Sequence, residues 1–156
     1  MTLVQELIEA REKEGYPIWI AGGASNDEVI RLEKAFGLLL PPSYVAFLTA
    51  YGAIGVGDSF VSGIVESDAL HEGGSSAYGD TLALRARQGF PSNLIVIGKH
   101  EDGAYCLDTA RHNADREYPV VNFEFGSIQH HQPVAISFED WLIRFQLYGT
   151  VSGGET

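Results

Sequence analysis

The sequence predicts a single α+β domain, from its length, its helical stripes and its strand-forming runs. A length of 156 residues corresponds to about one domain. Apolar residues recur at helical spacing in the first third of the chain and near its end, whereas strand-forming runs lie between them, at 94–100, 104–108 and 118–124. Because no repeat or linker divides the chain, we expect one domain over residues 1–148 and a flexible tail over residues 149–156.

The first predicted helix is amphipathic and ends near Gly15. Its apolar stripe consists of Leu3, Val4, Leu7 and Ile8. Residues 16–24 are expected to form a connector, since the Gly22-Gly23 pair is unsuited to a helix. Trp19, within this connector, is expected in or near the core.

A second helix is predicted from Ser25, which fits a capping box with Glu28, to Gly37. Pro41 pushes the preceding residue towards an extended conformation, and Pro42 suits the first turn of a new helix. The apolar stripe of this third helix consists of Tyr44, Phe47, Leu48 and Tyr51. The prolines therefore predict a corner between two helices whose apolar faces meet, which is a feature of folding rather than of chemistry.

The middle of the chain predicts two short strands within residues 53–65, joined by Gly57-Asp58. Residues 66–80 are expected to form a surface excursion. A short helix is then predicted at residues 81–88, with its core-facing side formed by Leu82, Ala83 and Ala86.

Residues 101–103, Glu-Asp-Gly, predict a hairpin between two strands, because glycine readily takes the positive φ that such turns need. The run Leu-Ile-Val-Ile at 94–97 has no polar alternation, which is typical of a strand covered on both faces.

Ser137 is predicted to cap a final helix. Its buried stripe is expected to be Phe138, Trp141, Leu142, Phe145 and Tyr148. The expected core of the domain includes Phe36, Leu40, Phe47, Leu48, Leu94, Val96, Leu107, Val121, Trp141 and Phe145.

Charge is the outstanding feature of the composition, with 21 acidic residues against 10 Lys and Arg and a net charge of −11. No Lys or Arg lies between Ala35 and Leu84. Such a surface repels phosphate backbones, so we expect no direct nucleic-acid binding and instead attraction to a basic partner. The competing interpretation is that the acidity only keeps the protein soluble.

The sequence has a single cysteine, no signal-peptide pattern and no apolar run long enough to cross a membrane. We therefore expect a reduced, cytoplasmic protein without membrane association.

No residue pattern indicates a catalytic centre, a cofactor site or a metal site. Gly52, Gly55 and Gly57 are in the wrong order for a dinucleotide fingerprint. The histidines, His71, His100, His112, His130 and His131, show no paired ligand spacing. Cys106 alternates with apolar neighbours and is expected to be a small buried hydrophobe. The alternative enzyme, a small hydrolase, requires histidines and carboxylates to converge in one pocket.

The order of the segments resembles the SUKH superfamily. The matching blocks are "SNDEVIRLEKAFGLLLPPSYVAFLTAYG", "GFPSNLIVIGKHEDGAYCLDT", "YPVVNF" and "SFEDWLIRF", which together run from about residue 25 to residue 145. The resemblance implies an α+β fold with a mainly antiparallel sheet packed by helices. It also implies a non-enzymatic role, because many bacterial members look like immunity proteins that bind and neutralise polymorphic toxins, often nucleases. Other members resemble regulatory or scaffold modules, which gives the alternative function.

We therefore expect a protein-binding module whose partner is a basic toxin domain. The main candidate surface consists of Asp58, Glu66, Asp68, Glu72 and Asp80, from the stretch without basic residues. Glu101 and Asp102 at the hairpin tip form a second candidate, and Tyr78 is a candidate exposed anchor. The oligomeric state, the identity of the toxin and the role of residues 66–78 stay open at this point.

Overall fold

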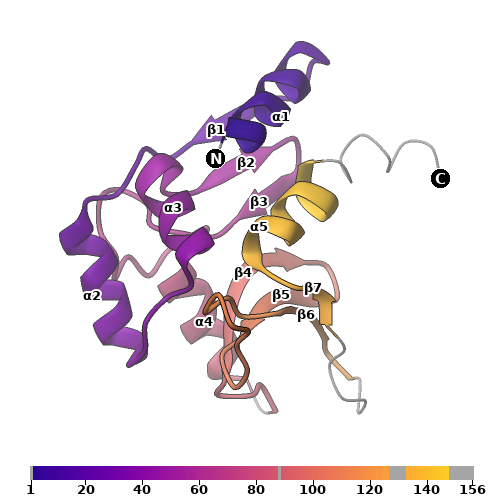
Figure 1. Cartoon of the computed structure of the whole chain (residues 1–156). Coiled ribbons are helices and arrows are strands. Elements are labelled where there is room, and N and C mark those ends of the chain that lie inside the picture. Colours follow the sequence, from indigo (N-terminus) through magenta and orange to yellow (C-terminus); the bar gives the residue numbers. More distant parts are fainter. Residues whose placement is uncertain (1, 88, 127–132, 148–156) are drawn as a thin grey trace.

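Two antiparallel sheets, one of three strands and one of four, form the framework of the computed structural model, which describes residues 2–87, 89–126 and 133–147 (Figure 1). The helices are α1 (Thr2–Lys13), α2 (Asn26–Phe36), α3 (Pro42–Tyr51), α4 (Ala77–Arg85), α5 (Phe138–Trp141) and the π-helical segment η1 (Leu142–Leu147). The strands are β1 (Ile18–Ile20), β2 (Ile54–Val56), β3 (Ser59–Val61), β4 (Leu94–His100), β5 (Gly103–Asp108), β6 (Val120–Glu124) and β7 (Pro133–Ala135). The predicted α+β fold with antiparallel sheets is confirmed. The predicted tail and Tyr148 lie outside the described residues.

The first sheet has the order β1-β2-β3. The predicted pair of short strands within residues 53–65 is confirmed, and Gly57 turns between them with φ 61°. The expectation that residues 16–24 form only a connector is wrong, because Ile18–Ile20 pair with Ile54–Val56. An Ile-Trp-Ile triplet is β-favouring, and a three-residue strand is too short to stand out beside the neighbouring glycines.

The second sheet has the order β4-β5-β6-β7, with the predicted hairpin at residues 101–102. Strand β4 lies at the junction of the two sheets, since the Ser62 amide donates to the Ile97 carbonyl at 2.8 Å. Ile95 and Ile97 face the larger core, while Leu94 and Val96 face a smaller one. The prediction that residues 94–97 are covered on both faces is therefore confirmed.

The corner between α2 and α3 forms as the prolines predict. Gly37 ends α2 in the left-handed region, at φ 74°, and Pro42 is the first residue of α3. Tyr44, Phe47 and Leu48 are completely buried. The Tyr44 and Phe47 rings stack on each other, and both meet the Phe138 ring at a steep angle. These ring contacts join α3 to the C-terminal helix α5.

The expected core is largely confirmed. The buried members are Leu40, Phe47, Leu48, Leu94, Val96, Leu107, Val121 and Trp141. Phe36 is only half-buried and packs at the edge of the core. The side chain of Phe145 lies outside what the structure describes. Ser137 caps α5 as expected, but the α-helix gives way to the π-helical segment after Trp141.

Helix α4 differs from its prediction in both its start and its face. It begins at Ala77 rather than at residue 81, because the Ser76 hydroxyl accepts from the Gly79 amide and caps it there. Leu84 points to the core, whereas Ala83 and Ala86 are exposed. Because the helix starts four residues earlier, Ala77, Gly79 and Asp80 are buried and Tyr78 is half-buried. Two of the predicted surface residues, Tyr78 and Asp80, are therefore less accessible than expected.

Candidate functional site

The three-stranded sheet exposes two aromatic rings on one face. Trp19 on β1, Gly55 on β2 and Phe60 on β3 are register partners, so all three positions lie on the same face. Trp19 is 41% exposed and Phe60 45%, with their ring centroids 6.3 Å apart. The alternate positions Ile54, Val56 and Val61 are buried in the core. We call Trp19, Gly55 and Phe60 the aromatic face.

Gly55 gives the aromatic face its shape. A Cβ atom at this position would lie 2.6 Å from Cε1 of Phe60, closer than two carbon atoms can approach. The missing side chain therefore lets the Phe60 ring lie against the strand. The result is a low aromatic surface in which large rigid side chains are already positioned, the kind of group that anchors protein interfaces.

A loop between β3 and α4 borders the aromatic face and turns it into a shallow groove of about 480 Å³. Besides Trp19 and Phe60, the lining residues are Val65, Glu66, His71, Gly74 and Ser75. Glu66 and His71 approach each other to 3.4 Å across the loop. Glu66 and Ser75 have positive φ values of 53° and 67°, so the loop holds conformations that non-glycine residues rarely adopt.

The loop is tied to α2 through Glu28. The Glu28 carboxylate accepts from the Ala69 amide at 2.9 Å and pairs with Arg31 at 2.7 Å. Arg31 in turn reaches Asp68 at 3.4 Å. These contacts hold the loop in place beside the groove, while Glu66 and Glu72 stay exposed.

Four of the five main predicted acids are accessible. Asp58 is exposed on the β2–β3 turn, Glu66 is exposed at the groove, and Glu72 is exposed on the loop. The side chain of Asp68 is 48% exposed although it contacts Arg31. Asp58 and Glu66 thus lie on the two segments that border the aromatic face, while Asp68 turns towards α2.

The expectation that Asp80 belongs to this surface is wrong. Asp80 is 2% exposed and accepts a hydrogen bond from the Ser62 hydroxyl at 2.6 Å. Its other oxygen pairs with Lys99 at 3.2 Å. The reason is the early start of α4, which turns the Asp80 carboxylate inward towards β3 and β4.

Tyr78 is also not a fully exposed anchor. It is half-buried on the first turn of α4, packs against the core, and lies 6.3 Å from the Phe36 ring. Glu101 and Asp102 are exposed at the tip of the β4–β5 hairpin, in the other sheet and outside the lining of the groove. The structure therefore separates the two candidate surfaces.

Sequence reasoning missed the aromatic face. Trp19 was expected in or near the core, but strand alternation places it on the outer face, 41% exposed. The signal was present in the apolar-glycine alternation of Ile54-Gly55-Val56, where a glycine between two core residues marks a close approach. Pairing Trp19 with Gly55 and Phe60 needs the register of three strands, which the sequence does not show.

Two of the histidines contact uncharged oxygen atoms. His100 contacts the Asn122 amide oxygen at 2.7 Å, and His112 contacts the Asn113 carbonyl at 3.1 Å. His130 and His131 lie outside the described residues. Over residues 2–87, 89–126 and 133–147, no three His, Cys, Asp or Glu side chains converge as metal ligands would. Cys106 is completely buried, and this burial raises the pKa of its thiol far above the ordinary range.

In the part of the chain that the structure describes, no helix has the length and apolar character to cross a membrane.

Comparison with protein families gives a match over most of the chain. The SUKH_5 family model, described as SMI1-KNR4 cell-wall, matches residues 2–145. The match includes every helix and all seven strands named above except the last two residues of η1.

Proposed function

Because the chain belongs to the SUKH superfamily, we propose that it acts by binding rather than by catalysis, as an immunity protein that neutralises a polymorphic toxin. The proposed partner is a basic toxin domain, such as a nuclease, and the proposed contact surface is the aromatic face with its bordering acids. The cytoplasm is the proposed location, since an immunity protein of this kind protects the cell that contains it.

The observation that carries the proposal is the exposed pair of Trp19 and Phe60. Large aromatic side chains left in solvent on a rigid sheet are characteristic of interfaces, where tryptophan and tyrosine dominate the binding energy. Here the missing Cβ of Gly55 gives the Phe60 ring room to lie against β2, with its centroid 6.3 Å from that of Trp19. A ring that already lies in its binding position loses less conformational entropy on association.

The charge of the border favours a basic partner. Glu66 lines the groove, Asp58 is exposed on the turn that joins β2 to β3, and the chain carries a net charge of −11. Complementary charges steer two proteins together before the anchors dock. A stable complex buries about 800 Å² on each partner, so the contact would extend beyond the groove onto the neighbouring loop.

The test is binding of the toxin domain encoded beside the gene of this protein, measured by surface plasmon resonance. Trp19→Ala combined with Phe60→Ala should weaken binding by about 2 kcal/mol or more, as loss of central aromatic anchors does. Ile136→Ala is the matched control, because Ile136 is 73% exposed beyond the end of β7, in the other sheet. An unchanged affinity in the double variant would exclude the aromatic face.

A second measurement separates binding from the alternatives. Mass spectrometry of the toxin, after it is released from the complex, should show an unmodified chain that regains activity. A covalently changed toxin would point to the hydrolase alternative. Failure of the unmodified protein to bind the toxin, together with stable co-purification of host regulatory proteins, would favour the scaffold alternative.

A further inference from the structure

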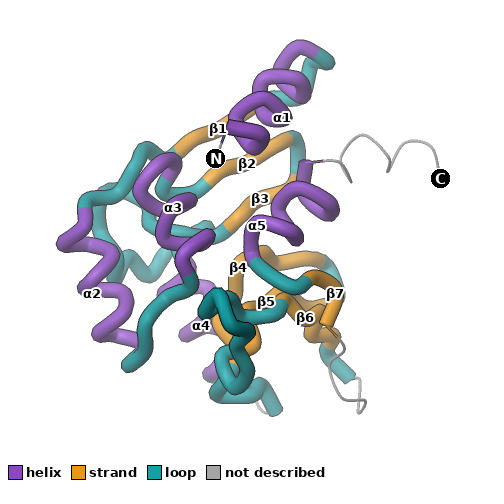
Figure 2. Tube along the Cα trace, in the orientation of Figure 1, coloured by secondary structure: helices purple, strands orange, loops and turns teal. Residues whose placement is uncertain are grey.

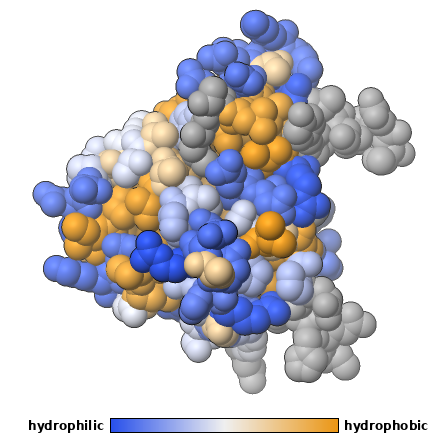
Figure 3. Space-filling view, viewed as in Figure 1, coloured by the Kyte–Doolittle hydropathy of each residue, from blue (hydrophilic) through white to orange (hydrophobic). Residues whose placement is uncertain are grey.

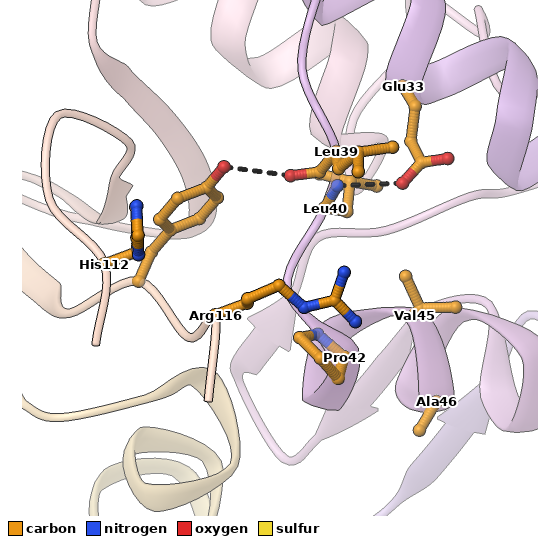
Figure 4. Close-up of a pocket in the computed structure, with 9 residues that line it drawn as sticks. Glu33, Leu39, Leu40, Pro42, Val45, Ala46, His112 and Arg116 are labelled. Atoms are coloured by element: carbon orange, nitrogen blue, oxygen red, sulfur yellow. Dashed lines mark hydrogen bonds between the residues drawn. The ribbon is translucent and has the colours of Figure 1, made fainter. Parts of the chain in front are cut away.

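The helix corner forms one wall of a second groove, separate from the aromatic face. This groove, of about 650 Å³, runs between the start of α3 and the loop of residues 109–119 (Figure 4). Its lining residues are Glu33, Leu39, Leu40, Pro42, Val45, Ala46, His112, Arg116 and Tyr118. We call this set the corner groove. On the face seen in Figure 3, hydrophobic surface near α2 and α3 adjoins hydrophilic residues.

The floor of the corner groove is apolar and partly uncovered. Leu39 is 66% exposed, more than any other leucine among the residues that the structure describes. Pro42 and Ala46 are exposed and Val45 is half-buried on the adjoining turns of α3. Apolar surface of this kind beside polar groups marks sites where another chain or ligand binds.

The opposite wall is held rigidly against the corner. The Tyr118 hydroxyl donates to the Leu39 carbonyl at 2.9 Å. The Glu117 carboxylate accepts from the Ser43 hydroxyl at 2.7 Å and the Ser43 amide at 2.9 Å. The groove is therefore already formed by contacts between segments far apart in the chain. The loop between β5 and β6 lies beside the start of α3, as the backbone trace in Figure 2 shows.

Arg116 supplies a positive charge to the corner groove. Each of the other six arginines has a described partner: Arg11, Arg31, Arg111 and Arg144 pair with carboxylates, Arg85 donates to the Ser92 carbonyl and Arg87 lies over the Phe125 ring. Within the described residues, no hydrogen bond or ion pair occupies the Arg116 guanidinium. Figure 4 shows this guanidinium directed over Pro42 towards the apolar floor.

Acidic and basic groups lie on different sides of the loop. Asp115 and Glu117 line a neighbouring hollow with Ser43, whereas His112 and Arg116 face the corner groove. Glu33 is the acidic group of the corner groove, and one of its oxygens accepts from the Leu40 amide at 2.8 Å. In Figure 4, Glu33 lies at the opposite end from His112. A bound anion would therefore avoid the Glu33 end and pair with Arg116.

We propose that the corner groove binds a short segment of a partner protein that carries apolar side chains next to an Asp or Glu. The apolar side chains would cover Leu39 and Val45, and the carboxylate would pair with Arg116, whose planar donors suit a carboxylate. An open groove of this volume accommodates a few side chains rather than a whole domain. The chemistry is opposite to that of the aromatic face, which is bordered by acids, so the protein presents two distinct binding surfaces.

The probe is a phage-displayed library of random heptapeptides panned against the full chain. The expected result is enrichment of peptides that combine an acidic residue with large apolar residues. A synthetic copy of the most enriched peptide should then lose affinity about tenfold or more with Arg116→Gln, because a charge-assisted hydrogen bond is removed. Arg111→Gln is the matched control, since Arg111 is exposed on the same loop, pairs with Asp108, and does not line the groove.

Amide and methyl NMR shifts locate the peptide independently of affinity. Binding should move the signals of Leu39, Val45 and Ala46 and leave those of Trp19 and Phe60 in place. The proposal is overturned if no acidic motif is enriched, if both arginine variants bind equally, or if the shifts map to the aromatic face. Concentration-dependent dimerisation that Leu39→Ser abolishes would also overturn it, by showing that a second copy of the chain fills the groove.

Discussion

Glu117 caps helix α3 from a position 74 residues later in the chain. Its carboxylate accepts hydrogen bonds from both the amide and the hydroxyl of Ser43, at 2.9 and 2.7 Å. The N-cap residue of this helix is Pro41, whose side chain makes no capping hydrogen bond. A carboxylate from the β5–β6 loop therefore accepts from a free amide in the first turn of α3 and places a negative charge at the positive end of the helix dipole.

Replacing Glu117 with Ala should lower the free energy of unfolding by about 1–2 kcal/mol, the usual cost of losing an N-terminal cap. Asp115→Ala serves as the control, because Asp115 is exposed on the same loop and its side chain makes no described contact with the helix. Urea unfolding followed by circular dichroism measures both variants. Equal stability of the two would show that the cap contributes nothing.

Asp80 should matter more for stability than its ion-pair partner. The carboxylate is buried and holds the Ser62 hydroxyl, while Lys99 is 51% exposed. Asp80→Ala leaves a buried hydroxyl without its acceptor and should cost about 2–4 kcal/mol. Lys99→Gln should cost about 1 kcal/mol or less, because the lysine end of the pair is solvated. Chemical denaturation of the two variants gives the comparison, and a larger loss for Lys99→Gln would contradict the buried network.

The Asp140–Arg144 pair predicts a specific dependence of stability on pH. Hydrogen bonds from the Arg144 guanidinium hold the pKa of Asp140 below its ordinary value of 3.8; partial burial opposes this shift and the Ile136 amide supports it. A lowered pKa in the folded state stabilises the fold above the unfolded pKa of about 4, and this contribution disappears as pH falls through the folded value.

The stability difference between the unmodified protein and Asp140→Asn should therefore be constant near neutral pH and shrink below about pH 4. Glu139→Gln removes the same charge one position earlier, outside the pair with Arg144, and so controls for the loss of one negative charge. Thermal unfolding at a series of pH values measures both differences. A gap for Asp140→Asn that does not vary with pH would rule out the pair as its source.

The four accessible acids of the main candidate surface should control the rate of association with a basic toxin. The test variant combines Asp58→Asn, Glu66→Gln, Asp68→Asn and Glu72→Gln, and it omits Asp80, which is buried. Steered association exceeds the ~10⁵–10⁶ M⁻¹s⁻¹ of neutral docking, so the variant should bind more slowly and with a weaker dependence on salt.

The matched control for that experiment removes four exposed acids elsewhere, through Glu6→Gln, Glu12→Gln, Glu101→Gln and Asp102→Asn. Both variants have the same net charge, so stopped-flow rates compare position rather than total charge. If the control slows association more than the test variant, the steering acids lie on α1 or at the hairpin tip. If neither slows it, none of these eight acids steers association.

Local signals predicted much of the fold. The Ser25 cap, the stop at Gly37, the start at Pro42, the Glu101–Gly103 hairpin and the Ser137 cap are all present as expected. Each of these depends on a few adjacent residues whose backbone preferences are strong. The predicted start of α4 is wrong because its cap, Ser76, lies in a glycine- and serine-rich stretch that is equally typical of a loop.

The sequence by itself determined most of the helices and strands, though not β1 or β7, together with the corner between α2 and α3 and the family resemblance, because these follow from short-range spacing. Only the tertiary structure decided which residues are available to a partner. It brought Trp19, Gly55 and Phe60 into one row, buried Asp80, and set Arg116 against the corner that Leu39 and Pro42 form. Such placements depend on strand register and on contacts such as that between Ser43 and Glu117, which join residues too far apart for any local pattern to specify.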